Sequence, residues 1–140
     1  LLSTKRVFFR GIFEELMWFL RGETNANILK AKNVHIWDGN TSREFLDKNR
    51  FYNRPLGDIG PGYGFQWRHF GAKYENMFSD YTGKGFDQIE YIIDLLKNNP
   101  NSRRIFMSAW NPVDISNMSL PPCHISYQFH VYNAFLSCSM

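Results

Sequence analysis

The chain has 140 residues, of which 44% are hydrophobic and 17% are aromatic, and its 16 basic and 13 acidic residues give a formal net charge of +3. This composition predicts a compact folded domain and excludes a disordered tail or linker. The longest apolar run falls far short of the ~20 residues of a membrane span, and the charge is too small and too evenly spread to indicate a nucleic-acid-binding face.

The first predicted element is a helix over residues 10–21, where apolar residues recur at helical spacing until Gly22. We expect this helix to be largely buried. A second, short helix should end at about Lys32. The stretch 36–81 then shows no sustained period, and an irregular stretch of that length with many aromatic residues is typical of a functional segment.

The second half of the chain predicts one helix followed by strands. A helical stripe covers residues 86–96, and strands are expected over 104–110, over 123–132 and from Phe135. A turn at 133–134 should join the last two strands as an antiparallel hairpin. This order predicts an α+β fold, with a mixed or antiparallel twisted sheet covered by helices on one face.

Cysteine usage and the chain ends give two further expectations. Cys123 and Cys138 lack the spacing of a zinc site or of a disulfide framework, so we expect free thiols in a reduced, cytoplasmic protein that binds no metal and is not secreted. The chain starts at Leu1 without an initiator Met and stops inside a predicted strand. Residues 1–140 are therefore expected to be part of a longer chain.

Two adjacent carboxylates lie within the first helix and point about 100° apart around its axis. Glu14 has Arg10 four residues before it, as in a solvent-facing pair, whereas Glu15 has apolar neighbours. Those neighbours should raise the pKa of Glu15, as a general acid at neutral pH requires. The alternative is a helix-edge glutamate satisfied by a backbone donor or a distant arginine, and the helix alone favours this alternative.

Two prolines precede Cys123 and His124 and should hold the cysteine rigidly where the predicted strand begins. A nucleophilic cysteine needs nearby positive charge to favour its thiolate. His124 should point to the opposite face of a strand, so a direct Cys-His dyad is not expected. The local context favours the alternative, in which Cys123 is a small buried hydrophobic residue.

Other candidate residues are ambiguous by themselves. Arg103 and Arg104 stand at the mouth of a predicted strand, where paired guanidinium groups can bind a phosphate, but a solvated strand end is equally consistent. The Gly-rich segment 57–64 lacks the spacing of a P-loop or dinucleotide fingerprint. Trp37 either stacks on a flat heterocycle or belongs to the core.

Several short segments are informative when their residues and order are taken together. They are Thr4-Lys5-Arg6, Glu15–Gly22 with Thr24-Asn25, Ile36-Trp37-Asp38, Gly57–Pro61, Tyr63–Arg68, Asp87-Gln88, Ser102-Arg103-Arg104, Ala109-Trp110-Asn111 and Pro122-Cys123-His124. Taken together they resemble the thymidylate synthase family, over essentially the whole chain. The insertion 40–54 looks more like the eukaryotic and large-DNA-virus branch than like the compact bacterial one. Gly62 departs from the pattern, because the family normally has an apolar residue there.

The resemblance implies a methyltransferase that converts dUMP to dTMP with 5,10-methylenetetrahydrofolate and releases dihydrofolate. Cys123 would add to C6 of the pyrimidine, Glu15 and Tyr63 would manage protons around the ring, and His124 would be a structural or substrate-side contact. Residues implied to contact the folate are Lys5, Phe8, Ile36, Trp37 and Asn40. No metal is implied.

The resemblance also implies partners. Arg103 and Arg104 would cross a two-fold interface to hold the dUMP phosphate of the partner subunit, so we expect an obligate homodimer formed through the other face of the sheet. The resemblance is also consistent with a fused dihydrofolate reductase domain. It is consistent with a nuclear or mitochondrial location as well as with a cytoplasmic one. About half of the family's catalytic domain is absent from this sequence, so the fragment alone is expected to be inactive.

Alternatives remain at this point. A deoxycytidylate or deoxyuridylate hydroxymethylase of the same fold would trap the methylene intermediate with water, although Trp37 favours the synthase. A nucleic-acid-binding module and a non-catalytic structural domain are alternatives from other classes, and the net charge of +3 gives the first little support.

Overall fold

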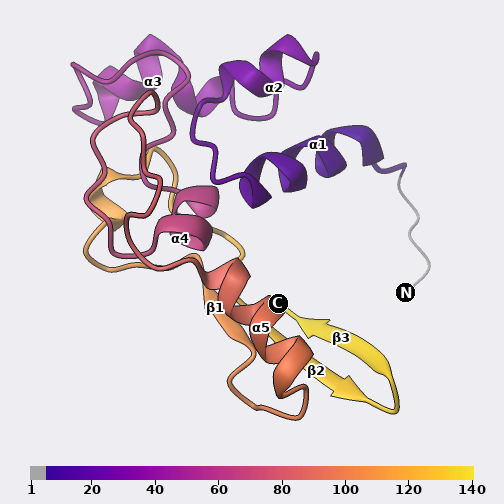
Figure 1. The fold of residues 1–140 in the computed structure, drawn as a ribbon. Helices are drawn as coiled ribbons and strands as arrows, with labels where there is room; N and C mark the ends of the chain where they lie inside the picture. The colour runs from indigo at the N-terminus through magenta and orange to yellow at the C-terminus, as the bar shows by residue number, and fades with distance from the viewer. Residues whose placement is uncertain (1–5) are drawn as a thin grey trace.

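The computed structural model describes residues 6–140, and the fold is shown in Figure 1. Five α-helices, two short 3-10 helices and three strands make up these residues. In chain order they are α1 (Phe9–Leu20), α2 (Asn27–Ala31), η1 (Gly39–Thr41), α3 (Arg43–Lys48), α4 (Tyr63–His69), α5 (Gln88–Asn98), β1 (Phe106–Ser108), η2 (Ile115–Asn117), β2 (Ser126–Tyr132) and β3 (Phe135–Ser139).

The three strands form one sheet in the order β1-β2-β3, and both pairs are antiparallel, with Met107 opposite Tyr127 and Phe129 opposite Cys138. Helix α5 lies across one face of this sheet in Figure 1 and contacts β1. The α+β class is therefore confirmed, and within residues 6–140 the sheet is antiparallel and not mixed. Positive φ angles of 47° at Asn133 and 63° at Ala134 form the tight turn that the hairpin required.

The hydrophobic core joins α1, α2, α4, α5 and β1 through buried side chains that include Trp18, Leu29, Trp67, Ile92 and Met107. Helices α1 and α4 approach closely because α4 carries a glycine at the crossing. A Cβ on Gly64 would lie only 2.8 Å from the backbone carbonyl oxygen of Phe19. This close approach brings the last turn of α1 against the first turn of α4, where the candidate site is found.

The long segment 36–81 is not wholly irregular, because it contains η1, α3 and α4. Helix α3 is begun by Ser42, whose hydroxyl accepts a hydrogen bond from the backbone N–H of Phe45 at 3.2 Å. Helix α4 begins directly after Gly62. With six and seven residues, these helices are too short to produce a sustained apolar period.

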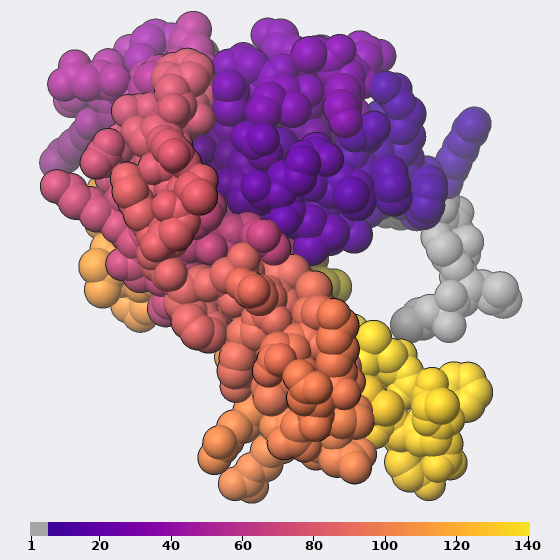
Figure 2. Space-filling model, in the orientation of Figure 1, coloured from indigo at the N-terminus to yellow at the C-terminus, as the bar shows by residue number. Residues whose placement is uncertain are grey.

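Helix α1 lies within one residue of the expected bounds, but the prediction that it is largely buried is wrong. Ile12, Phe13 and Leu16 are 50%, 51% and 44% exposed, whereas Trp18 and Phe19 are buried. Among residues 6–140, core partners pack only against the last turn of this helix and its inner edge. Figure 2 shows that, on this face, the surface of α1 (indigo) does not meet the hairpin β2–β3 (yellow).

The strands are shorter than predicted. The strand expected over 104–110 covers only Phe106–Ser108, and the strand expected over 123–132 begins at Ser126. The two prolines and the bend at 123–124 delay pairing, so Cys123 and His124 lie in the loop before β2.

Among the described helices, none combines the length and hydropathy needed to cross a membrane.

Candidate functional site

Four segments that are distant in sequence meet at a cavity of about 190 Å³. Helix α1 supplies Glu15 and Phe19, the loop before α3 supplies three residues, α4 supplies its first residue, and the loop before β2 supplies the rest. The lining residues are Glu15, Phe19, Ile36, Trp37, Asn40, Tyr63, Leu120, Cys123 and His124. Seven of these nine were candidates from the sequence.

Glu15 lies half-buried at the edge of the cavity, and its carboxylate oxygen accepts a hydrogen bond from the indole Nε1–H of Trp37 at 2.7 Å. Burial raises the pKa of Glu15 above its ordinary value of 4.5, while the Trp37 hydrogen bond and the nearby His124 oppose that rise. The raised pKa matches the expectation from the helix neighbours. The partner is an indole, whereas the alternative from the sequence required a backbone donor or an arginine.

Glu14 behaves as a surface carboxylate, but its partner differs from the predicted one. Its Oε2 lies 2.6 Å from Nζ of Lys32, and this hydrogen-bonded pair is the main reason that the pKa of Glu14 is lowered. Arg10 contributes a weaker attraction and donates its own hydrogen bond to the backbone carbonyl of Lys32. The helix periodicity could not reveal Lys32, because tertiary packing brings α2 and Lys32, the residue that follows it, against α1.

Tyr63 forms the floor of the site and holds the cysteine loop. Its phenol oxygen accepts a hydrogen bond from the backbone N–H of Cys123 at 2.7 Å and lies 3.5 Å from the backbone N of His124. Its ring stacks on Phe19 with centroids 4.5 Å apart, and Trp37 meets it edge-on at 6.1 Å. Burial raises the pKa of the Tyr63 phenol, so the group is neutral at physiological pH.

Cys123 is exposed at the cavity, so the alternative of a buried hydrophobic cysteine is wrong. The argument that Cys123 and His124 face opposite sides of a strand is also wrong. Both residues lie in a bend before β2 instead of in the strand, and both line the cavity. A bend does not impose the alternation of side chains that a strand imposes.

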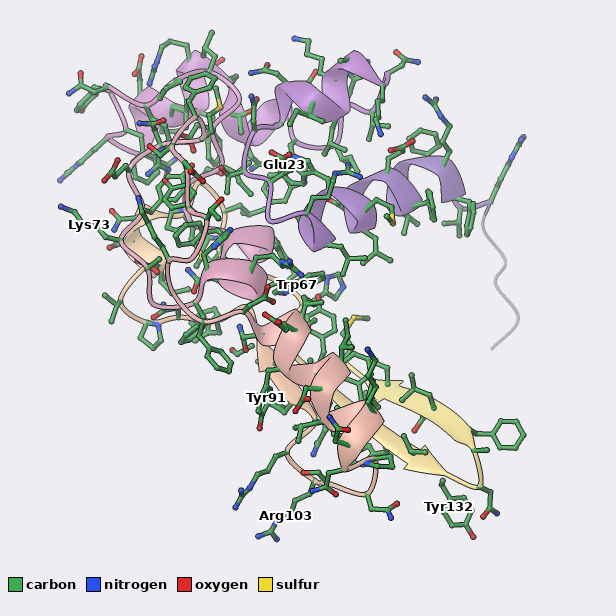
Figure 3. The ribbon with its side chains drawn as sticks, viewed as in Figure 1. Glu23, Trp67, Lys73, Tyr91, Arg103 and Tyr132 are labelled. Atoms are coloured by element: carbon green, nitrogen blue, oxygen red, sulfur yellow. The ribbon has the colours of Figure 1, made fainter. Side chains whose placement is uncertain are left out.

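The remaining predicted site residues do not line this cavity. Phe8 caps the start of α1 and is 57% exposed, and Lys5 lies outside the described residues. Arg103 and Arg104 are exposed in the turn before β1. Figure 3 shows Arg103 at the lower end of the view, pointing away from the molecule, whereas Trp67 lies near the middle, where its ring meets Phe19 edge-on with centroids 5.5 Å apart.

Phe19 and Leu120 line the cavity but were not among the predicted site residues. Phe19 could have been found, because it lies four residues after Glu15 and so on the same face of the same helix. Leu120 has no such signal, since only the folded loop brings it to the site.

The cavity is small, and its lining consists of apolar, aromatic and polar side chains with one cysteine and one glutamate. A volume of about 190 Å³ is below the roughly 300–1,000 Å³ of a small-molecule pocket, so these residues can enclose one planar ring. Three larger cavities of about 520, 760 and 700 Å³ lie elsewhere and contain no cysteine. Over residues 6–140, no group of three or more His, Cys, Asp or Glu side chains is arranged to hold a metal ion.

The fold and the cavity define an α+β domain that presents an exposed cysteine beside a half-buried carboxyl group and a buried phenol. A family model described as thymidylate synthase matches residues 1–140. The chain belongs to the thymidylate synthase family. This finding confirms the resemblance inferred from the motifs.

Individual relatives are similar over the whole chain. Bifunctional dihydrofolate reductase-thymidylate synthase 1 of Arabidopsis thaliana is 61% identical over 140 residues, which are 100% of this chain and 27% of the relative. A putative bifunctional dihydrofolate reductase-thymidylate synthase of Oryza sativa is 60% identical, with 100% and 28% covered. Thymidylate synthase of Homo sapiens is 58% identical, with 100% and 45% covered. The chain thus spans about a quarter of the plant relatives and less than half of the human one.

Proposed function

We propose that the protein methylates dUMP to dTMP, with 5,10-methylenetetrahydrofolate as both carbon donor and reductant. The observation that carries this proposal is the cavity in which Cys123, Glu15 and Tyr63 meet. The exposed thiol of Cys123 lines this cavity together with the carboxyl group and the phenol, as covalent catalysis on a small ring requires. The relatives named as thymidylate synthases support the same reaction.

The proposed chemistry begins when the Cys123 thiolate forms a bond to C6 of the uracil ring, which makes C5 nucleophilic. C5 then bonds to the folate methylene and loses its proton, and tetrahydrofolate leaves. Hydride transfer from tetrahydrofolate to the exocyclic methylene completes the methyl group, and the Sγ–C6 bond breaks. The products are dTMP and dihydrofolate, and Cys123 is regenerated.

Glu15 and Tyr63 are proposed to handle protons in this sequence. A carboxyl whose pKa is raised by burial can give a proton to the pyrimidine O4 and recover it, and its hydrogen bond to Trp37 fixes its orientation. Tyr63 is proposed to assist loss of the C5 proton through ordered water. His124, at the same cavity, is proposed as a contact on the substrate side.

The folate is proposed to lie against Ile36, Trp37 and Asn40. Ile36 is 48% exposed and presents apolar surface at the cavity, next to the buried ring of Trp37. Stacking of a flat pterin on such a surface is favourable. Phe8 and Lys5 remain proposed folate contacts by the family resemblance alone.

The product of the one-carbon transfer tests the function. The complete protein, given dUMP and 5,10-methylenetetrahydrofolate, should form dTMP and dihydrofolate in equal amounts, measured by absorbance and by chromatography. Formation of hydroxymethylated nucleotide with tetrahydrofolate would instead establish the hydroxymethylase. If neither product forms while RNA or DNA binds at sub-micromolar strength with steep salt dependence, the nucleic-acid alternative is correct.

Arg103 and Arg104 are proposed to bind the dUMP phosphate in the partner subunit of a homodimer. Both arginines are exposed and neither lines the cavity of its own chain, which supports this proposal. Paired guanidinium groups suit a phosphate. The sheet face not covered by α5 is proposed as the interface.

Mixed dimers test this shared site. A dimer of one Arg104→Ala chain and one Cys123→Ser chain would contain one site with both defects and one intact site. Mixing the two inactive variants under subunit exchange should therefore restore about one quarter of wild-type activity, since about half of the dimers are mixed and each has one working site. An absence of any recovery, with mixed dimers demonstrated by mass spectrometry, would contradict sharing.

The fused relatives support a dihydrofolate reductase domain as a further proposed partner, which would consume the dihydrofolate that this reaction releases. A cytoplasmic location is proposed from the free thiols Cys123 and Cys138, since reduced cysteines persist there.

A further inference from the structure

The loop 109–125, which carries Cys123, is fastened to a single segment of the chain. At its far end the Cys123 N–H donates to Tyr63, and in its middle the Ser119 N–H donates to the carbonyl of Ile59 at 2.9 Å. Near its start, Asn111 and Asp114 bind Gln66. All three anchors lie within residues 59–66, so this one segment determines the position of the cysteine loop.

The anchor at Gln66 is a cluster of three buried polar side chains. Gln66 is 0% exposed, Asn111 is 6% exposed and Asp114 is 9% exposed. One Asp114 oxygen accepts from Gln66 Nε2 at 2.8 Å and from Asn111 Nδ2 at 3.0 Å, and Asn111 Nδ2 also lies 3.1 Å from Gln66 Oε1. A closed cluster of this kind has one favourable geometry, since a buried polar group without its partner is costly.

The cluster is tied to the rest of the core. Gln66 Nε2 also donates to the carbonyl of Pro61 at 2.9 Å, and Gln88 Nε2 donates to the carbonyl of Gln66 at 2.8 Å. Gln88 in turn exchanges hydrogen bonds with the backbone of Ser108, where β1 ends. These hydrogen bonds therefore fix the start of the cysteine loop relative to α4, the helix that carries Tyr63.

We propose that Gln66, Asn111 and Asp114 are positioning residues that set the place of the Cys123 thiol relative to the cavity. This inference rests on the proposed function. None of the three lines the cavity, so they act through the loop and through α4. Gln66 lies one helical turn after Tyr63, so a shift at the cluster moves the loop relative to the phenol that holds the Cys123 N–H.

The test compares substitutions at Asp114 in the complete protein. Asp114→Leu removes both hydrogen bonds, whereas Asp114→Asn keeps an oxygen that can accept both. Asp114→Leu should lower kcat by about 100-fold, the size of effect expected from a nucleophile misplaced by about 1 Å, with KM for dUMP within about threefold. Asp114→Asn should retain kcat within about threefold of wild type.

A second measurement reports on the thiol without any turnover. Cys138 is also exposed and lies on β3, so it serves as the internal reference. The ratio of iodoacetamide alkylation rates at Cys123 and Cys138, followed by mass spectrometry, should change by more than about threefold in Asp114→Leu and stay near wild type in Asp114→Asn. If Asp114→Leu does not fold, Asn111→Ala is measured in its place.

Tyr74→Phe is the matched control, because it removes hydrogen bonds of 3.0 Å to Thr24 and 2.7 Å to Asp58 from a different buried cluster. It should lower thermal stability without changing the alkylation ratio. A folded cluster variant with unchanged kcat and an unchanged ratio would overturn the positioning role. A wild-type protein that forms no dTMP would overturn the proposed function instead, and the alkylation ratio would still decide the positioning role.

Discussion

Cys123→Ser should reduce dTMP formation by the complete protein by roughly 1,000-fold or more. The nucleophile is the thiolate, and a serine hydroxyl at the same place ionises far less at neutral pH. The change replaces one exposed atom, while the backbone N–H of residue 123 keeps its hydrogen bond to Tyr63 at 2.7 Å. The loss should therefore appear as lower initial rates of dihydrofolate formation with unchanged thermal unfolding.

Cys138→Ser is the matched control for this loss. Cys138 is the second free and exposed thiol of the chain, but it lies on β3 and does not line the cavity. This variant should keep activity within about twofold of wild type, since exposed substitutions away from a site rarely cost much. Turnover by Cys123→Ser at a near wild-type rate would refute covalent catalysis by this residue, and equal losses in both variants would point to a general requirement for thiols.

The sequence predicted the elements that have a long and regular apolar period. Helices α1 and α5 and the β2–β3 hairpin each carry such a period or a clear turn signal, and the structure places them within a few residues of the expected bounds. Helices α3 and α4 were missed because six or seven residues give no repeated period. Their formation depends on a capping serine and on tertiary packing, which a linear pattern records poorly.

The sequence predicted most of the residues that line the cavity, but it did not predict the contacts between them. Glu15 and Trp37 were chosen for separate reasons, and nothing in either segment indicated that the indole would donate to the carboxylate. The bend before β2 changed the geometry of Cys123 and His124, because pairing with β1 begins only at Ser126. Contacts between distant segments decide such details, and local propensity does not contain them.

Glu15→Gln should lower dTMP formation by roughly 100-fold to 10,000-fold, the usual contribution of a positioned acid-base group. The amide keeps the size of the side chain and an oxygen that can accept from Trp37 Nε1, but it cannot transfer a proton. Glu14→Gln, on the same helix, should change the rate by less than about threefold, because that carboxylate pairs with Lys32 outside the cavity. Comparable losses in the two variants would contradict the assignment of Glu15.

The same pair of variants should have opposite effects on stability as pH changes. The pKa of Glu15 is raised in the folded protein, so its contribution to stability is complete below its ordinary pKa of 4.5 and is lost as pH rises through the folded-state pKa. The pKa of Glu14 is lowered, so its contribution is present above its ordinary value and is lost as pH falls.

Thermal unfolding measured between about pH 4 and about pH 8 should show how the stability of each variant, relative to wild type, changes with pH. Relative to wild type, Glu15→Gln should gain stability as pH rises, whereas Glu14→Gln should lose it. A Glu15→Gln protein that loses stability over this range would show that the carboxylate is stabilised in the folded state, contrary to the raised pKa. If the expected signs are found, the proposed catalytic carboxyl is kept at a cost in stability, which is a property of acid-base groups and not of structural ion pairs.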